Sequence, residues 1–167
     1  LHRVFPSGFY ENTIDRIIDK RIFQPRGDTE EMFLQIPLDW EALDKFEDRN
    51  WRMTLQSWGM FHPILNVFDS YSGKEKLVQY FFEIANDWCE LYLDDPDDII
   101  SSRMPDSYAW YDMSVGYRAL TIAFFIDRIS EHNLSITDEQ KKLIFKLARK
   151  HIRHLSNPET TTMRNNH

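Results

Sequence analysis

Apolar residues recur at helical spacing throughout the chain after Asn50. The stretches Trp51–Tyr71 and Tyr108–Glu131 carry apolar residues on nearly every face, which predicts two helices buried on most sides. The stretches after Gly73 and after Thr137 each carry one apolar stripe and predict amphipathic helices. Alternation of buried and amphipathic helices predicts an all-α fold with an inner and an outer layer.

Local signals refine these helices. Pro63 predicts a kink in the first helix or a break in its hydrogen-bond ladder. Asp106 or Ser107 is a candidate cap for the third, and Thr137 with Gln140 fits a capping box that opens the fourth. The fourth helix is expected to bury one stripe consisting of Leu143, Ile144, Leu147, Ala148, Ile152 and Leu155. Its other faces are expected to carry Lys141, Lys142, Lys146, Arg149 and Lys150, with Arg153, His151 and His154 forming a basic last turn.

Residues 1–49 form a different region, interrupted by prolines and a glycine. A short helix over Ile14–Lys20 and short extended segments at Ile22–Phe23 and Met32–Ile36 are expected. The pattern predicts an irregular arm that wraps a helical body formed by residues 50–167.

Three landmarks, Trp51, Trp110 and Asn166, are nearly equally spaced, a little under sixty residues apart. Such a period is typical of repeated helix hairpins, as in solenoids and toroids. Inner helices of successive hairpins run in the same direction, so their first residues should lie at one end of the molecule. The residues expected there are Asn50, Trp51, Arg52, Tyr108, Trp110, Tyr111, Asp112, Asn166 and His167.

Composition restricts the function. At 167 residues the chain fits one domain, and 14% aromatic residues fit either a bulky core or a cleft in which flat rings stack on sugars. A net charge of −7 disfavours nucleic-acid binding, so an anionic ligand would need a locally positive cleft. There is no apolar run of membrane-spanning length.

Metal and disulfide chemistry find little support in the sequence. Cys89 is the only cysteine, which excludes an internal disulfide. The acidic run Asp94–Asp98 lacks the spaced ligands and glycine of a calcium loop and is interpreted as a solvated loop. No His, Cys or Asp group has zinc-site spacing, and no cofactor is expected in this region.

Several motifs, in order along the chain, resemble the helical N-terminal region of the heparinase II/III-like and oligo-alginate lyase family. They are Ile36-Pro37-Leu38-Asp39-Trp40, Asp48-Arg49-Asn50-Trp51-Arg52, Tyr108-Ala109-Trp110-Tyr111-Asp112-Met113 with Arg118-Ala119, and Asn165-Asn166-His167. Tyr111 departs from the pattern, because family members often carry His there. The resemblance implies an incomplete (α/α) toroid of antiparallel helix hairpins, truncated at its C-terminus and followed elsewhere by further helices and a β-sandwich region.

The resemblance also implies β-elimination on a polysaccharide that contains uronic acid. Asn166 matches the residue that neutralises the sugar carboxylate, and His167 would assist it or act as the base; both are the expected catalytic residues. The family's catalytic Tyr and a second His would lie beyond this chain. The expected partner is an acidic polysaccharide or oligosaccharide in the bacterial periplasm or outside the cell, with the cytoplasm as the alternative.

Alternatives remain open at the level of the sequence. The residues expected to contact substrate are Trp51, Arg52, Tyr108, Trp110, Tyr111, Asp112 and Arg118. Trp51 and Trp110 fit a core position equally well, and Asp112 with Arg118 fits a structural ion pair. The other functions considered are a non-catalytic polysaccharide-binding or scaffold protein and a glycoside hydrolase, which would need two carboxylic acids flanking the bond.

Overall fold

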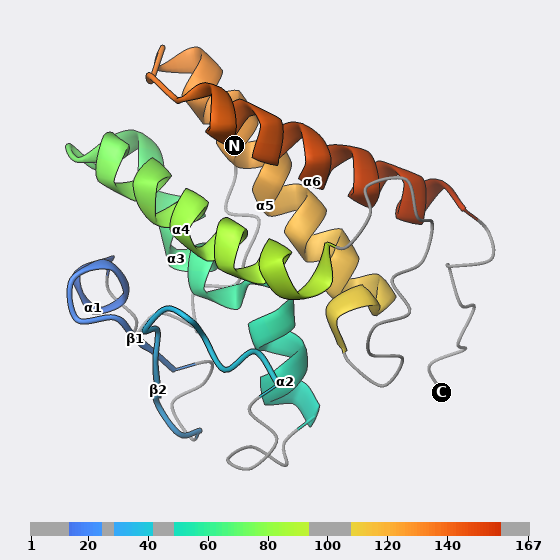
Figure 1. Ribbon diagram of the computed structural model, residues 1–167. Helices are drawn as coiled ribbons and strands as arrows, with labels where there is room; N and C mark the ends of the chain where they lie inside the picture. Colours follow the sequence, from blue (N-terminus) through green and yellow to red (C-terminus); the bar gives the residue numbers. More distant parts are fainter. Residues whose placement is uncertain (1–13, 25–28, 42–48, 94–107, 158–167) are drawn as a thin grey trace.

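The computed structural model describes residues 14–24, 29–41, 49–93 and 108–157, and it is predominantly helical (Figure 1). The all-α prediction is therefore confirmed. The elements in chain order are α1 (Ile14–Ile18), β1 (Ile22–Phe23), β2 (Met32–Phe33), α2 (Arg49–Gln56), η2 (Gly59–Phe61), α3 (His62–Val67), η3 (Phe68–Ser70), α4 (Lys74–Tyr92), η4 (Tyr108–Trp110), α5 (Asp112–Glu131) and α6 (Asp138–Ser156).

The first long helix of the sequence prediction is in fact broken, and not at the proline. The chain leaves α2 at Trp58, whose backbone is left-handed with φ 58° and ψ 41°. Pro63 lies in the first turn of α3, where its missing N–H costs no helical hydrogen bond. The helix is therefore not kinked at Pro63; the alternative, a break in the ladder, is found just before it, between Gln56 and His62. The left-handed turn directs the completely buried Trp58 ring against Trp88, with the ring centroids 5.8 Å apart and nearly perpendicular.

The N-terminal arm is anchored to α4 by a few specific contacts. β1 and β2 pair antiparallel, with Ile22 opposite Phe33, which confirms the short extended segments. Trp40 donates its indole N–H to the Asp87 carboxylate over 2.7 Å, and the Leu38 amide donates to the same oxygen over 3.1 Å. Asp87 is a buried acid, so these two donors replace the water it loses. The arm thus contributes to the core.

An aromatic cluster joins the two halves of the helical body. Phe81 of α4 stacks on Phe125 of α5 with centroids 4.3 Å apart, and Phe61 contacts both rings. α5 and α6 form an antiparallel pair, and α4 crosses below them in Figure 1. The capping box at the start of α6 is confirmed, because the Gln140 amide donates to the Thr137 hydroxyl and the Thr137 amide to the Gln140 side chain.

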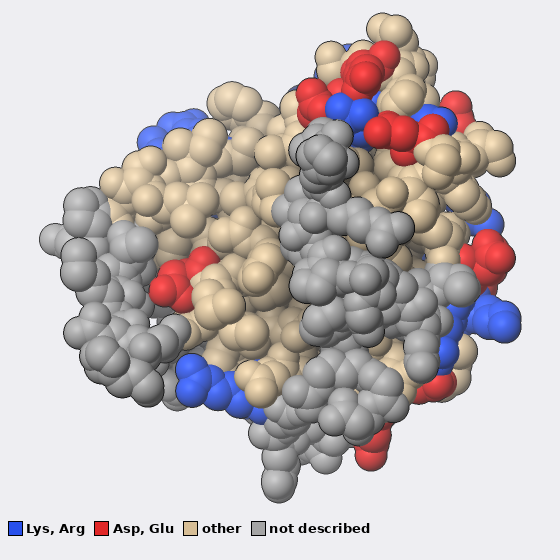
Figure 2. Space-filling model, turned by 180° about the vertical axis from the view of Figure 1, so that it is seen from behind, with Lys and Arg blue, Asp and Glu red and all other residues tan. Residues whose placement is uncertain are grey.

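α5 is buried on one side only, contrary to the prediction. Met113, Leu120 and Ile126 are each about two-fifths exposed, at 39%, 42% and 39%. Figure 2, the view from behind, shows a broad uncharged area with most charged residues around its rim. α5 therefore has more apolar side chains than the described residues bury.

α6 also buries a different stripe from the predicted one in its second half. Ile152 and Leu155 are exposed, whereas Lys150, His151 and His154 are buried together with Leu147. These four residues lie at helical spacing on one face of a continuous helix. The buried stripe of α6 therefore changes from apolar to polar residues along the helix. The predicted basic last turn is present, with Arg153 and His154 in it, but His151 and His154 are buried.

The two glycines Gly59 and Gly116 provide a matched test of this packing. A Cβ on Gly59 would stand 2.6 Å from Thr54 Cγ2 and 3.0 Å from the Thr54 carbonyl oxygen, whereas a Cβ on Gly116 would meet nothing within 4 Å. Gly59→Ala should lower the free energy of unfolding by about 1–3 kcal/mol. Gly116→Ala lies inside α5 and should raise it by about 0.5–1 kcal/mol. Urea unfolding checks both values, and a neutral Gly59→Ala would contradict the close approach.

Candidate functional site

The predicted gathering of helix starts is found where α2 meets η4. The Arg52 guanidinium lies 5.1 Å from the centroid of the Tyr108 ring, and that of Arg49 lies 5.9 Å from it. Tyr111 packs edge-on against Tyr108 at 6.0 Å. We call Arg49, Arg52, Tyr108 and Tyr111 the arginine–tyrosine corner. Residues about sixty positions apart in the sequence therefore form one surface, as the spacing predicts.

The corner carries two guanidinium groups and is partly open. Arg49 is exposed, and the Arg52 side chain retains 20% of its exposure. The Glu41 carboxylate lies 3.7 Å from Arg52 and offsets part of its charge. A guanidinium presents a planar fork of N–H donors that matches a carboxylate, and a tyrosine face can stack on a sugar ring. Together these groups suit a carboxylated sugar.

A hydrogen-bonded chain connects this corner to the core. The Tyr92 hydroxyl donates to Glu41 and accepts from the Gln56 amide over 2.9 Å. The side-chain oxygen of Gln56, Oε1, accepts a hydrogen bond from the Trp88 indole N–H over 3.0 Å. Gln56 is 1% exposed, so each bond is made without competing water. The sequence analysis missed Gln56, and no signal in a single sequence separates it from the exposed glutamines.

Trp51 and Arg118, two residues expected to contact substrate, lie in the core. Trp51 is 2% exposed, packs against Phe23 at 6.5 Å and donates its indole N–H to the Glu30 carbonyl oxygen over 3.3 Å. Arg118 is completely buried. Neither side chain reaches a surface that a ligand could contact, so both expectations are corrected to structural roles.

Arg118 holds four segments together. Its two terminal nitrogens donate to the backbone carbonyls of Gln56 and Ala109, and its Nε donates to His151 Nε2 over 3.2 Å. The guanidinium lies 4.3 Å from the Trp88 ring centroid. Burial lowers the pKa of Arg118 to about 9, which leaves it charged at neutral pH. Its charge is therefore met by carbonyl dipoles, an imidazole and aromatic faces.

The expected ion pair between Asp112 and Arg118 is not formed. Asp112 instead accepts a hydrogen bond from the Met113 amide over 2.6 Å, at the start of α5. An acid in the first turn also complements the helix dipole. Asp112 and Tyr111 are half-buried beside the corner, and each keeps some access to solvent.

His151 is held neutral beside Arg118. Its Nδ1 lies 2.8 Å from the Leu147 carbonyl oxygen and is assigned as the donor, which leaves Nε2 to accept from Arg118. Burial, followed by the Arg118 charge, lowers the pKa of His151 to about 3. Trp110 is half-buried and packs against His151 and His154 with centroids 5.4 Å and 5.2 Å away. Trp110 thus belongs mainly to this cluster.

The two expected catalytic residues, Asn166 and His167, lie outside the described residues, as do Asp94–Asp98 and the candidate caps Asp106 and Ser107. Among the residues that the structure does describe, no group of three or more His, Cys, Asp or Glu side chains could hold a metal ion. Within the same ranges, no helix is long and apolar enough to cross a membrane.

Comparison with known proteins finds no matching family model, no matching curated protein and no matching solved structure.

Replacing Arg118 should cost more stability than replacing an exposed cation of the same hairpin. Arg118→Met keeps the aliphatic stem but removes all donors to Gln56, Ala109 and His151, so the free energy of unfolding should fall by about 3–5 kcal/mol. Arg118→Lys should recover part of that, because an ammonium cannot reach all three acceptors. Lys142→Met is the control, because Lys142 is exposed, and should stay within about 0.5 kcal/mol. A loss below 1 kcal/mol in Arg118→Met, measured by urea unfolding, would contradict this role.

The neutral His151 makes stability depend on pH. An unfolded histidine binds a proton near pH 6.5, whereas the folded pKa of His151 is about 3, so the unfolded state gains protons first as the pH falls. Stability is therefore complete above pH 6.5 and should fall by roughly 1.4 kcal/mol per pH unit below it. His62, whose pKa is lowered to about 4 by burial, adds in the same direction.

His151→Gln isolates the His151 contribution. The amide can still accept from Arg118 and donate to Leu147, but it does not titrate. The variant should lose less stability than the wild type between pH 7 and pH 4.5. Urea unfolding across that range measures the difference. Parallel profiles for the two proteins would show that His151 is not held neutral by the fold.

Proposed function

We propose that this chain is the N-terminal part of a polysaccharide lyase that cleaves a uronic-acid polysaccharide by β-elimination. The observation that carries the proposal is the arginine–tyrosine corner, a local concentration of guanidinium and phenol groups in a protein of net charge −7. The net charge of the protein repels an anionic sugar at long range. The arginines of the corner can therefore attract the sugar only at short range, once it is in contact with them.

The chemistry requires the sugar carboxylate to be neutralised before C5 can lose its proton. In the proposed reaction Arg52 binds a substrate carboxylate, Tyr108 stacks on a sugar face, and the Asn166 amide donates to the carboxylate of the reacting residue. A base, for which His167 is the candidate, takes the C5 proton; the C4–O bond breaks as the C4=C5 double bond forms. The leaving oxygen receives a proton from a general acid, for which the proposal takes the catalytic Tyr that the resemblance implies.

We further propose that the helices form part of an (α/α) toroid. The antiparallel helices α5 and α6 both contact α4, and the pair carries exposed apolar residues. Phe145 and Ile152 of α6 are 65% and 63% exposed, and α5 carries further exposed apolar residues. Repeated hairpins bury such flanks against the next repeat. A further hairpin packed there would continue the toroid.

The test is an elimination assay with the protein encoded by the complete reading frame. Uronic-acid polysaccharides are screened by the ultraviolet absorbance of the unsaturated product. Arg52→Ala should raise KM about 10- to 100-fold, because a charged hydrogen bond to substrate is lost. The matched control is Arg16→Ala, since the Arg16 side chain is 22% exposed and also faces a glutamate, Glu31, but lies in the arm.

The outcomes separate the functions. Product formation that requires Asn166 and His167 establishes the lyase. Absence of product across the panel, with sugar binding that still depends on Arg52, would replace the lyase with the non-catalytic binding protein. Absence of both product and binding would remove the polysaccharide from the proposal altogether.

A further inference from the structure

α6 carries a concentration of positive charge that the corner does not use. No acidic residue occurs from Lys141 to Asn157, although acids outnumber bases in the whole chain by 27 to 20. Lys142, Lys146, Arg149 and Arg153 follow one another at intervals of four, three and four residues. This spacing places them in one row along the helix, which we call the cationic row.

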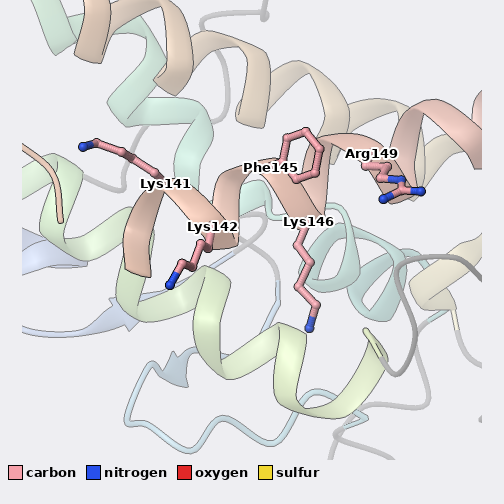
Figure 3. A pocket seen from close by; sticks show the side chains of 5 residues that line it. All are labelled: Lys141, Lys142, Phe145, Lys146 and Arg149. Atoms are coloured by element: carbon pink, nitrogen blue, oxygen red, sulfur yellow. The ribbon is translucent and has the colours of Figure 1, made fainter. Parts of the chain in front are cut away.

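The row is accessible and is accompanied by a hollow in the surface. Lys142 and Lys146 are exposed, and Arg149 is half-buried. The hollow measures about 420 Å³ and is lined by Lys141, Lys142, Phe145, Lys146 and Arg149. In Figure 3 Lys142 and Lys146 extend in the same direction, toward α4, while the Phe145 ring stands on the other side of the helix. The ammonium groups thus point along one edge of α6.

The rest of α6 shows that the row is separate from its packing surfaces. Leu147, Lys150, His151 and His154 occupy the buried face, and the exposed apolar residues Phe145 and Ile152 lie next to the row, on the side away from that face. The packing of α6 against α5 uses the buried face and does not require the cationic row. The exposed lysines of the row, Lys142 and Lys146, are therefore accessible to a ligand even if a further hairpin covers the apolar edge.

We infer that the cationic row binds a linear acidic polysaccharide at a site distinct from the arginine–tyrosine corner. Successive cations in the row are separated by one helical turn, about 5–6 Å along the axis, so the row presents charge along a line. A linear polyanion with a charge on each sugar matches this pattern better than a compact anion does. That the ligand is a polysaccharide rests on the proposed function; that the row binds a polyanion does not.

The row leads toward the corner. Because α6 runs antiparallel to α5, its C-terminal end lies beside η4, where His154 packs against Trp110 at 5.2 Å. The corner residue Tyr108 belongs to the same short helix as Trp110. A chain held along the row therefore has its end near the corner. The row would retain a long polysaccharide between successive cleavages, and a short oligosaccharide would occupy the corner alone.

Charge argues against a nucleic acid as the ligand. A duplex places a phosphate about every 1.7 Å along its axis, and its binding relies on a broad basic surface. The net charge of −7 repels so dense a polyanion, and four cations are few for it. A polyuronate has fewer charges per length and sugar faces that can contact Phe145.

The experiment measures the binding of long alginate and of a short alginate oligosaccharide to the folded chain by calorimetry at low and high salt. Lys142→Glu with Lys146→Glu should weaken the binding of long alginate about tenfold or more at low salt, and salt should reduce the difference. Binding of the short oligosaccharide should be unchanged by this pair but weakened by Arg52→Ala. Circular dichroism establishes that each variant is folded.

The matched control is Lys20→Glu with Lys76→Glu, which makes the same change in net charge at two exposed lysines away from α6. An equal loss of long-alginate binding in both pairs would overturn the inference, because global charge would explain it. Displacement of alginate by an equal charge concentration of single-stranded DNA would assign the row to nucleic acid instead. If the row variant binds long alginate as the wild type does, and binding still requires Arg52, the row is not a binding site. The proposed function is unaffected by that result.

Discussion

The arrangement of this protein depends on how the buried Arg118 charge is satisfied. A guanidinium removed from water must recover its hydrogen bonds from the protein, and here two backbone carbonyls and an imidazole accept them. These acceptors belong to the end of α2, to η4 and to α6. Since the fork of donors is planar and rigid, the three segments can occupy only a narrow range of positions around α5.

The candidate site is positioned through the same set of contacts. Arg118 binds the Gln56 carbonyl, and the Gln56 side chain bonds to Tyr92, which in turn bonds to Glu41 beside Arg52. Each residue in this series holds the next one in place. The orientation of Arg52 at the surface therefore depends on the buried Arg118. An arginine with several rotatable bonds loses less entropy on binding a ligand when a neighbouring carboxylate already restrains it.

Sequence periodicity predicted the helices and the meeting of α2 with η4, because both follow from regular spacing. It failed at Trp58, where a left-handed residue is stabilised by aromatic contacts with segments distant in the sequence. It failed again in the second half of α6, where Lys150 and His151 are polar by type yet buried around Arg118 and Trp110. A pattern that sorts residues by hydropathy cannot anticipate a buried polar cluster, since its partners come from other helices.

The surface of α6 shows how one helix can serve three environments. Its buried face carries the polar partners of Arg118, one exposed edge is apolar and the other is cationic. A helix selected only for stability would place its apolar residues on the buried face and mix acids with bases outside, which weakens local repulsion. After its first turn, α6 instead carries like charges one turn apart over three turns. That arrangement opposes stability, and an anionic ligand that relieves the repulsion is a physical reason for its presence.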